Sequence, residues 1–170
     1  MKIEGSCSCG SIKVEGEADE NAVSVCHCTD CQTASGSAFR VAVPVAGATF
    51  KVSGQPTIFI KTTAESGNPR AQAFCPTCGA SLYSTTPGEG QQAMYIVRVG
   101  MLEQRDQLLP KRQIWWRSAR NWVTGLGHPQ AREAGLTAFG KSRFALSHGQ
   151  HSRTPEQWTS STNWKASRHR

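Results

Sequence analysis

Seven cysteines gathered into three short clusters constrain this chain more than any other feature of its sequence. In chain order, the clusters contain Cys7 and Cys9, then Cys26, Cys28 and Cys31, then Cys75 and Cys78. An odd number of thiols cannot all pair as disulfides, and clustered cysteines in a reduced compartment favour metal or redox chemistry. We therefore expect the clusters to hold metal ligands.

Zinc accounts for the spacing within the clusters. Zn²⁺ takes four ligands in a tetrahedron, with Zn–S distances of about 2.3 Å. Residues two apart in an extended segment project from the same face, so each C-x-C pair can present both sulfurs to one ion. In "CPTCG" (75–79), a turn that begins at Pro76 brings together sulfurs three residues apart, and Gly79 permits a tight exit.

Two divisions of the cysteines are compatible with this geometry. The first forms a closed site from Cys7, Cys9, Cys75 and Cys78. It leaves the three thiols of "CHCTDC" (26–31) as ligands with one open corner, which is typical of a catalytic zinc. The second division forms the closed site from Cys26, Cys28, Cys75 and Cys78. The first division uses every thiol and predicts two zinc ions per chain.

The remaining composition is that of an ordinary soluble protein. The 170 residues, 38% hydrophobic and 18% charged, are enough for one domain with its own core. No segment reaches the roughly 18–20 apolar residues that span a bilayer. The first residues also lack the apolar core of a signal peptide. We therefore expect a cytoplasmic protein with no membrane partner.

Short segments separated by turns predict a mainly β fold. The expected strands are 11–17, 22–28, 38–45, 48–54, 57–63, 81–86, 93–100 and 112–116. Only two short helical segments are expected, at 29–35 and 118–126.

The character of the chain changes after residue 131. Residues 1–131 carry 12 basic and 10 acidic side chains, and residues 132–170 carry 7 and 2. The second segment has few aliphatic residues and little periodicity, so we expect a zinc-binding domain over 1–131 and a basic, disordered tail over 132–170. Because most of the net charge lies in the tail, it does not indicate that the folded part binds nucleic acid.

Several of these segments together resemble a known family. "GSCSCGSIKVE", "CHCTDCQTASGSAF", "FCPTCGASLYS", "VRVGML" and "QIWWRSARNWV" are similar, in order, to the glutathione-dependent formaldehyde-activating enzyme (GFA) family, which includes centromere protein V. The resemblance implies a β-tent fold of antiparallel sheets stapled by zinc. It also implies a structural zinc and a catalytic zinc. The structural set is Cys7, Cys9, Cys75 and Cys78, and the catalytic set is Cys26, Cys28 and Cys31.

The family further implies carbon–sulfur lyase chemistry, in which a thiol such as glutathione and an aldehyde form or release an adduct such as S-hydroxymethylglutathione. A zinc on three thiolates carries a formal charge of −1, but it can still bind an incoming thiol and hold it as the thiolate. We expect the three cysteines to act as ligands and no protein residue to act as nucleophile. The residues that contact the substrate and the oligomeric state do not follow from the sequence.

Other notable residues have ordinary structural interpretations. Strand alternation should turn His27 away from the metal. Asp30 should cap the turn after Thr29. We expect Arg98 to be a solvated or ion-paired strand residue. Packing in the core is the expectation for Trp115, Trp116 and Trp122.

Three alternatives stay open. The chain could be a non-catalytic, zinc-stabilised binding module, with His27 or a tail histidine as an eighth ligand. It could be a thiol–disulfide oxidoreductase using "CPTC" or "CTDC", although no βαβ context surrounds either motif. The basic tail could add nucleic-acid binding, although we expect this tail to be a solvated segment.

Overall fold

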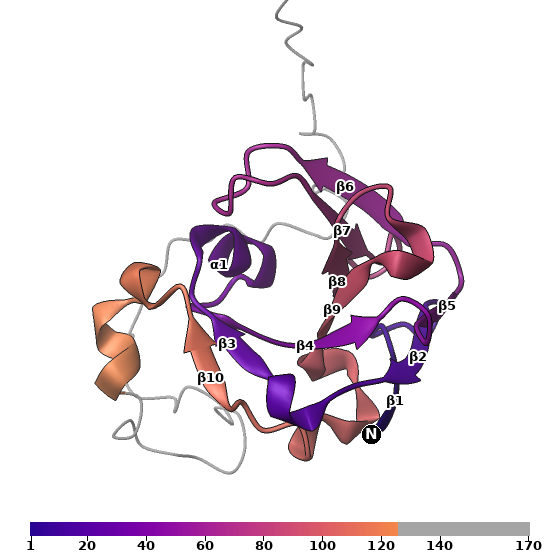
Figure 1. The fold of residues 1–170 in the computed structure, drawn as a ribbon, viewed down its shortest axis with the longest axis horizontal. Coiled ribbons are helices and arrows are strands. Elements are labelled where there is room, and N and C mark those ends of the chain that lie inside the picture. The colour runs from indigo at the N-terminus through magenta and orange to yellow at the C-terminus, as the bar shows by residue number, and fades with distance from the viewer. Residues whose placement is uncertain (126–170) are drawn as a thin grey trace, which may run out of the picture. The chain divides into compact units, whose positions relative to one another are not determined.

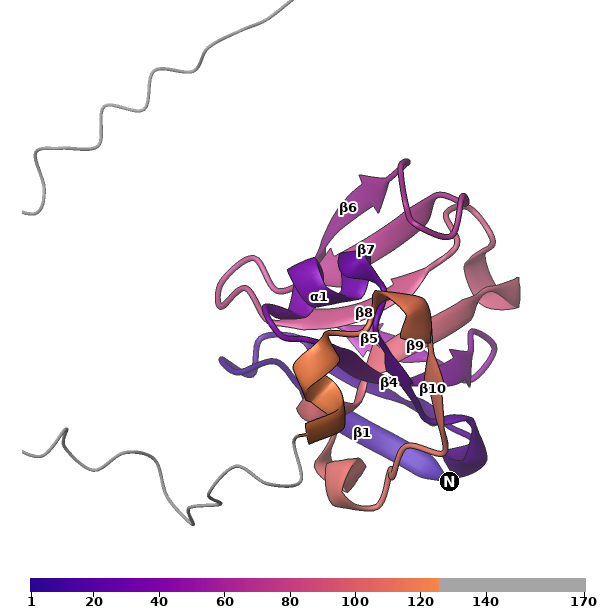
Figure 2. The same ribbon diagram turned by 90° about the vertical axis from the view of Figure 1, so that its left-hand side faces the viewer.

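The computed structural model describes residues 1–125, which form two β-sheets and one short α-helix (Figures 1 and 2). The small sheet has the strand order β1-β2-β5, and the large sheet has the order β10-β3-β4-β9-β8-β7-β6. The strands are β1 (Lys2–Ser6), β2 (Lys13–Glu17), β3 (Ser24–Cys26), β4 (Arg40–Ala46), β5 (Lys51–Ser53), β6 (Thr57–Lys61), β7 (Arg70–Phe74), β8 (Ser81–Thr85), β9 (Met94–Arg98) and β10 (Arg112–Ile114).

Helical structure is confined to short connections in this part of the chain. The α-helix is α1 (Thr29–Ser35). The 3₁₀ turns are η1 (Glu20–Ala22), η2 (Gly90–Gln92), η3 (Val99–Met101), η4 (Glu103–Asp106), η5 (Trp116–Ser118) and η6 (Asn121–Gly125). Within residues 1–125, no helix is long and apolar enough to cross a membrane.

The large sheet curves around α1, which lies between the β3–β10 end and the β6–β7 end (Figure 1). Adjacent strands of this sheet pair antiparallel, except for β10 and β3. These two pair in parallel, with Ile114 opposite Cys26. This parallel pair brings the tryptophan-rich segment after β10 beside the middle cysteine cluster.

The two faces of the large sheet differ in chemistry. Along β4, Val43 and Val45 are fully buried in the main core, whereas Arg40 and Pro44 line a cavity on the other face. The core also buries Leu82 and other aliphatic side chains between the two sheets. Fully burying one such side chain contributes about 1.5–3 kcal/mol. The apolar face therefore stabilises the fold, and the opposite face is available for chemistry.

The small sheet is held closely against the segment that follows β9. Gly5 in β1 forms an isolated bridge with Leu102, which is fully buried. A Cβ atom at Gly5 would overlap the carbonyl oxygen of Met101, so this position accommodates only glycine without a shift of the backbone. This close contact fixes the strand that leads into Cys7.

The mainly β prediction is confirmed, with differences in detail. Strands β1 and β7 were not expected, and 118–126 contains 3₁₀ turns. The sequence of β7, "RAQAF", does not predict a strand, because its buried residues are alanines, which have low strand propensity. The expected tail, and with it the boundary at residue 131, lies outside the described residues.

Candidate metal centre

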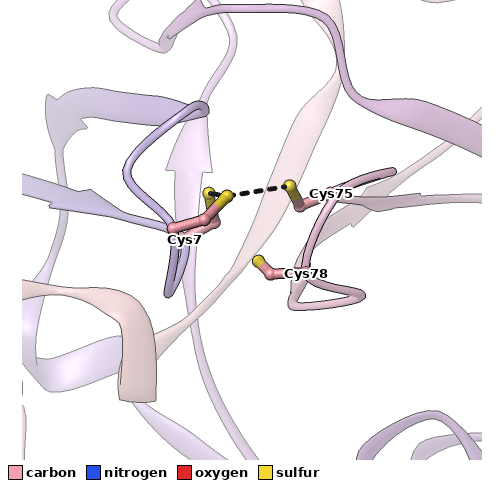
Figure 3. A group of neighbouring side chains, drawn as sticks. Cys7, Cys75 and Cys78 are labelled. Atoms are coloured by element: carbon pink, nitrogen blue, oxygen red, sulfur yellow. Dashed lines mark hydrogen bonds between the residues drawn. The ribbon is translucent and has the colours of Figure 1, made fainter.

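Two tight turns of similar construction bring the first and last cysteine clusters together. In the first turn, the backbone N–H of Gly10 donates to the Cys7 carbonyl at 2.9 Å. In the second, the N–H of Gly79 donates to the Cys75 carbonyl, also at 2.9 Å. Both glycines have positive φ angles, 75° and 71°, which glycine adopts without strain. The turns face each other across a small gap (Figure 3).

The four sulfurs at these turns have the spacing of a zinc site. The ligand atoms of Cys7, Cys9, Cys75 and Cys78 all lie within 4.8 Å of one another. Two of the separations are 3.5 Å, between the sulfurs of Cys7 and Cys9, and 3.7 Å, between those of Cys9 and Cys75. A tetrahedron with Zn–S bonds of about 2.3 Å has edges of about 3.8 Å. The donor set therefore fits Zn²⁺ with four protein ligands.

The hydroxyl of Ser11 adds polar support to this group. Its oxygen lies 3.0 Å from the Cys9 sulfur and 3.4 Å from the Cys75 sulfur. The hydrogen bond from Ser11 is the largest cause that lowers the pKa of the Cys75 thiol, to about 5. A thiolate at Cys75 is the form that binds metal.

The middle cluster forms a separate and more buried group. Cys26 ends β3, Cys28 is the N-cap of α1, and Cys31 lies in the first turn of that helix. Their sulfurs form a triangle with sides of 3.5, 3.0 and 3.2 Å. All three side chains are buried, with exposed fractions of 4–8%. The structure thus brings together the same sets of four and three that the first division predicted.

The three neighbouring thiols are electrostatically suited to a cation. Hydrogen bonds with Cys28 and Cys31 lower the pKa of the Cys26 thiol to about 3. The hydrogen bonds that Cys31 forms with Cys26 and Cys28, together with burial, raise the pKa of the Cys31 thiol. One thiolate forms readily, but three buried thiolates at such distances repel one another. A divalent cation removes this repulsion, so this donor set also fits Zn²⁺.

The triangle opens onto a cavity of about 870 Å³. All three of its cysteines line this cavity, and none of the other four cysteines does. The floor is the polar face of the large sheet, with Gln72, Ser84 and Ile96 among its residues. A metal held by the triangle would have its fourth position facing this space, which is the arrangement of a catalytic site.

Three arginines line the same cavity: Arg40, Arg70 and Arg112. Arg40 begins β4 and is the direct cross-strand partner of Cys26. The sequence analysis did not identify these residues, because the curvature that brings β7 opposite β3 is a tertiary property. The alternation along "RVAVPV" (40–45) was the only available signal that Arg40 faces away from the core.

Trp115 forms an aromatic wall beside the triangle. It packs against the three buried cysteines and lines the cavity, and the Arg117 guanidinium lies 4.6 Å from its ring centroid. Its φ of 58° is unusual for a residue with a bulky side chain. The expectation of core packing is wrong for Trp116 and Trp122, whose exposed fractions are 48% and 59%.

The expectation that His27 turns away from the metal agrees with its contacts. It is fully buried, its Nε2 lies 2.8 Å from Gln113 Oε1, and its ring packs edge-on against Trp116.

Arg98 differs from its expectation. It is buried, donating to the Ser81 hydroxyl and the Ile96 carbonyl, and burial lowers its pKa to about 9. It is therefore neither solvated nor, within residues 1–125, ion-paired.

The expected cap at Asp30 is wrong, because Cys28 takes that role by accepting a hydrogen bond from the Cys31 N–H. Asp30 instead accepts from the Glu65 backbone N–H at 2.7 Å and pairs with Lys61 at 3.2 Å. The Glu65 carboxylate in turn accepts two hydrogen bonds from Thr29. These bonds fasten the 62–69 loop to the start of α1, at the rim of the cavity.

The chain is similar to known proteins in two respects. The family model described as glutathione-dependent formaldehyde-activating enzyme matches residues 2–118. A solved crystal structure of a Rhodobacter sphaeroides protein is similar, with 20% sequence identity and a TM-score of 0.49, covering 65% of this chain and 98% of that protein. No curated protein matches the chain.

Proposed function

Because the chain belongs to the glutathione-dependent formaldehyde-activating enzyme family, we propose that it is a zinc-dependent carbon–sulfur lyase. The reaction joins a thiol to an aldehyde, or separates them, as in S-hydroxymethylglutathione. One observation carries the proposal: all three cysteines of the triangle line one cavity, whereas of the group of four only Cys7 lines a cavity. We place the reaction in the cytoplasm, where free thiols stay reduced.

The two cysteine groups have different roles in this proposal. Cys26, Cys28 and Cys31 would hold the catalytic zinc, which would supply a site for the substrate thiol as its thiolate. Cys7, Cys9, Cys75 and Cys78 would hold the structural zinc. In the forward direction the thiol sulfur bonds to the aldehyde carbon, and the thiol proton ends on the former carbonyl oxygen.

The chain's own contribution is to position both reactants. The cavity walls bring the thiol and the aldehyde together, which turns a bimolecular reaction into an effectively intramolecular one. The buried sulfurs and Trp115 limit water near the metal position. His27 has no role as a base in this scheme, because its ring faces Gln113 and two aromatic side chains.

The test combines metal content with turnover. We would measure zinc per chain by elemental analysis, and the exchange between formaldehyde and its glutathione adduct by NMR, for the wild type and for Cys26→Ser. The expected result is two zinc ions and accelerated exchange in the wild type, and one zinc ion and no acceleration in the variant. Ser53→Ala, at an exposed position of β5, serves as the control. A variant that keeps two zinc ions and wild-type exchange would contradict the proposal.

A second candidate function is a non-catalytic binding module. It is favoured by β6, which lies at one edge of the large sheet with Ile58, Phe59 and Ile60 each about half exposed. An exposed apolar edge strand can add a strand from a partner. This candidate predicts that no thiol or aldehyde changes the metal environment and that only changes in β6 abolish function.

A further inference from the structure

Arg98, the last residue of β9, is a buried cation whose hydrogen bonds go only to neutral groups. It is 6% exposed, its Nε donates to the Ser81 hydroxyl, and its Nη1 donates to the Ile96 carbonyl. Its Nη2 is buried and has no hydrogen-bond partner within residues 1–125. A charge buried in this way costs stability unless an anion lies near it.

The carboxylates of the described chain do not supply that anion, since none of them forms an ion pair with Arg98. Glu103 borders the same cavity of about 940 Å³ as Arg98, but it is exposed. Asp30 already has its own ion pair with a lysine. Glu89 is exposed beside the other cavity, where its charge acts on Arg70.

A second arginine lies beside Arg98 on the same face of the large sheet. Arg98 is opposite Ala42 in the β4–β9 ladder, and Arg40 lies two residues before Ala42. Residues two apart on a strand share a face, so the two arginines are diagonal neighbours. The Nε of Arg40 is also buried and lacks a hydrogen-bond partner in the part of the chain that the structure describes.

The cysteine triangle adjoins this pair of arginines. Arg40 is directly opposite Cys26 in the β3–β4 ladder. Burial is the main cause that lowers the pKa of Arg98, to about 9, and the charge of Arg40 lowers it further. Thiolates at Cys31 and Cys26 act in the opposite direction and favour the charged guanidinium. The two arginines therefore repel each other, and the triangle attracts Arg98.

Three thiolates around one divalent cation keep a net negative charge, and a substrate thiolate in the fourth position makes the centre more negative. A cation held in the protein interior stabilises such charge more strongly than a cation in water, because the dielectric constant there is lower. The buried arginines and the triangle thus have complementary charges.

We propose that Arg98, together with Arg40, offsets the negative charge of a metal centre at the cysteine triangle and so strengthens the binding of the metal and of a substrate thiolate. The proposal rests on the function given above, because it needs a metal at the triangle. Arg98 does not line the cavity that the triangle lines, so it is a positioning residue and touches no reactant.

A purely structural role for Arg98 would be to fasten β8 to β9 through its two hydrogen bonds. Loss of those bonds would weaken both cysteine groups together. The electrostatic role predicts a loss mainly at the triangle. Cys7 does border the same cavity as Arg98, but Cys9 and Cys78 are exposed, so solvent screens charge at the group of four.

The experiment measures the zinc affinity of the full chain by competition with a chromophoric chelator. Arg98→Met removes the charge and keeps a long apolar side chain, Arg98→Lys keeps the charge, and Arg40→Gln removes the second charge. Arg105→Gln is the matched control, because this exposed arginine borders the same cavity as Arg98 but not the cavity of the triangle. Cys28→Ser, which should keep only the zinc of the group of four, identifies the affinity of that group. Calorimetric titration of the zinc-loaded chain with 2-mercaptoethanol measures thiolate binding.

We expect Arg98→Met and Arg40→Gln each to weaken zinc binding at the triangle at least about tenfold, and to weaken it much less at the group of four. Binding of 2-mercaptoethanol should weaken in the same variants. Arg98→Lys should recover most of both losses, and Arg105→Gln should behave as the wild type does.

Equal weakening at both groups, or a loss in Arg98→Lys as large as in Arg98→Met, would overturn the inference in favour of a structural role. Unchanged affinities in Arg98→Met and Arg40→Gln would also overturn it and leave the proposed function standing. If Arg98→Met does not fold, Arg40→Gln decides by the same criterion. A wild type that binds only one zinc ion would overturn the proposed function as well.

Discussion

The two cysteine groups differ in where their protein ligands come from and in what lies beyond them. The group of four joins turns that are far apart in the sequence, and its sulfurs face one another (Figure 3). The group of three comes from a single stretch of six residues, 26–31, and faces a cavity. A metal that links distant segments holds the fold together, whereas a metal on one local segment contributes little to it. Metal ions held by the two groups would thus serve structure at one and chemistry at the other.

The largest effect should come from removing a ligand of the group of four. Cys75→Ser is expected to abolish cooperative folding, because a structural zinc contributes folding free energy directly, about 10–16 kcal/mol in small zinc domains. Circular dichroism during heating should show no thermal transition for the variant, and elemental analysis should show loss of zinc. A variant with a normal transition would mean that this metal does not staple the fold.

A smaller loss of stability is expected at the contact between the small sheet and Leu102. Gly5→Ala places a Cβ atom 2.8 Å from Leu102 Cα. Such overpacking against backbone costs about 1–3 kcal/mol. Urea denaturation should measure this loss, with Gly100→Ala as the control because a Cβ there meets nothing within 4 Å. Equal midpoints for the two variants would show that the contact is not tight.

Removing a ligand of the group of three should leave the fold largely intact. Cys28→Ser keeps a favoured N-cap, since serine can accept the same hydrogen bond from the Cys31 N–H. We expect a change in the free energy of unfolding of about 1 kcal/mol or less. Zinc content should fall from two ions to one, and adduct exchange should be lost. Unfolding of this variant would remove the distinction between the two groups.

The smallest change in the free energy of unfolding should come from Glu65, at the rim of the cavity, and this change should depend on pH. The backbone N–H of Thr29 is the main cause that lowers the pKa of the Glu65 carboxyl. A lowered folded-state pKa stabilises the protein above the ordinary value, and this stabilisation is lost as the pH falls through the folded value. Glu65→Gln should therefore be less stable than the wild type near pH 7, with the difference shrinking below about pH 4. A constant difference from pH 7 to pH 3 would contradict the role of this carboxylate.

The sequence predicted that the sulfurs within each cluster converge, because that geometry is local. It left two pairings of the clusters open, and the family resemblance favoured the one observed. Alternation in C-x-C and the turn in "CPTCG" depend only on neighbouring residues, and the structure brings together the predicted sets. Arg40 and Arg70 were not predicted, because their approach to the triangle depends on strand register and on the curvature of the large sheet. The exposure of Trp116 and Trp122 was also not predicted, because it too depends on where the chain lies in the tertiary structure. They look like core residues in the sequence but follow β10, the edge strand of the sheet.

The parallel pairing of β10 with β3 has a consequence for the order in which the molecule assembles. The bond between His27 and Gln113 joins residues 86 positions apart. Contacts between such distant segments form late, because the loop between them must first be closed. The wall that carries Ile114 and Trp115 therefore joins the sheet late, as does the bridge between Gly5 and Leu102, whose partners are further apart in the sequence. Because β10 is a short, exposed edge strand, this wall would open without unfolding of the rest, and hydrogen exchange should be fast in it.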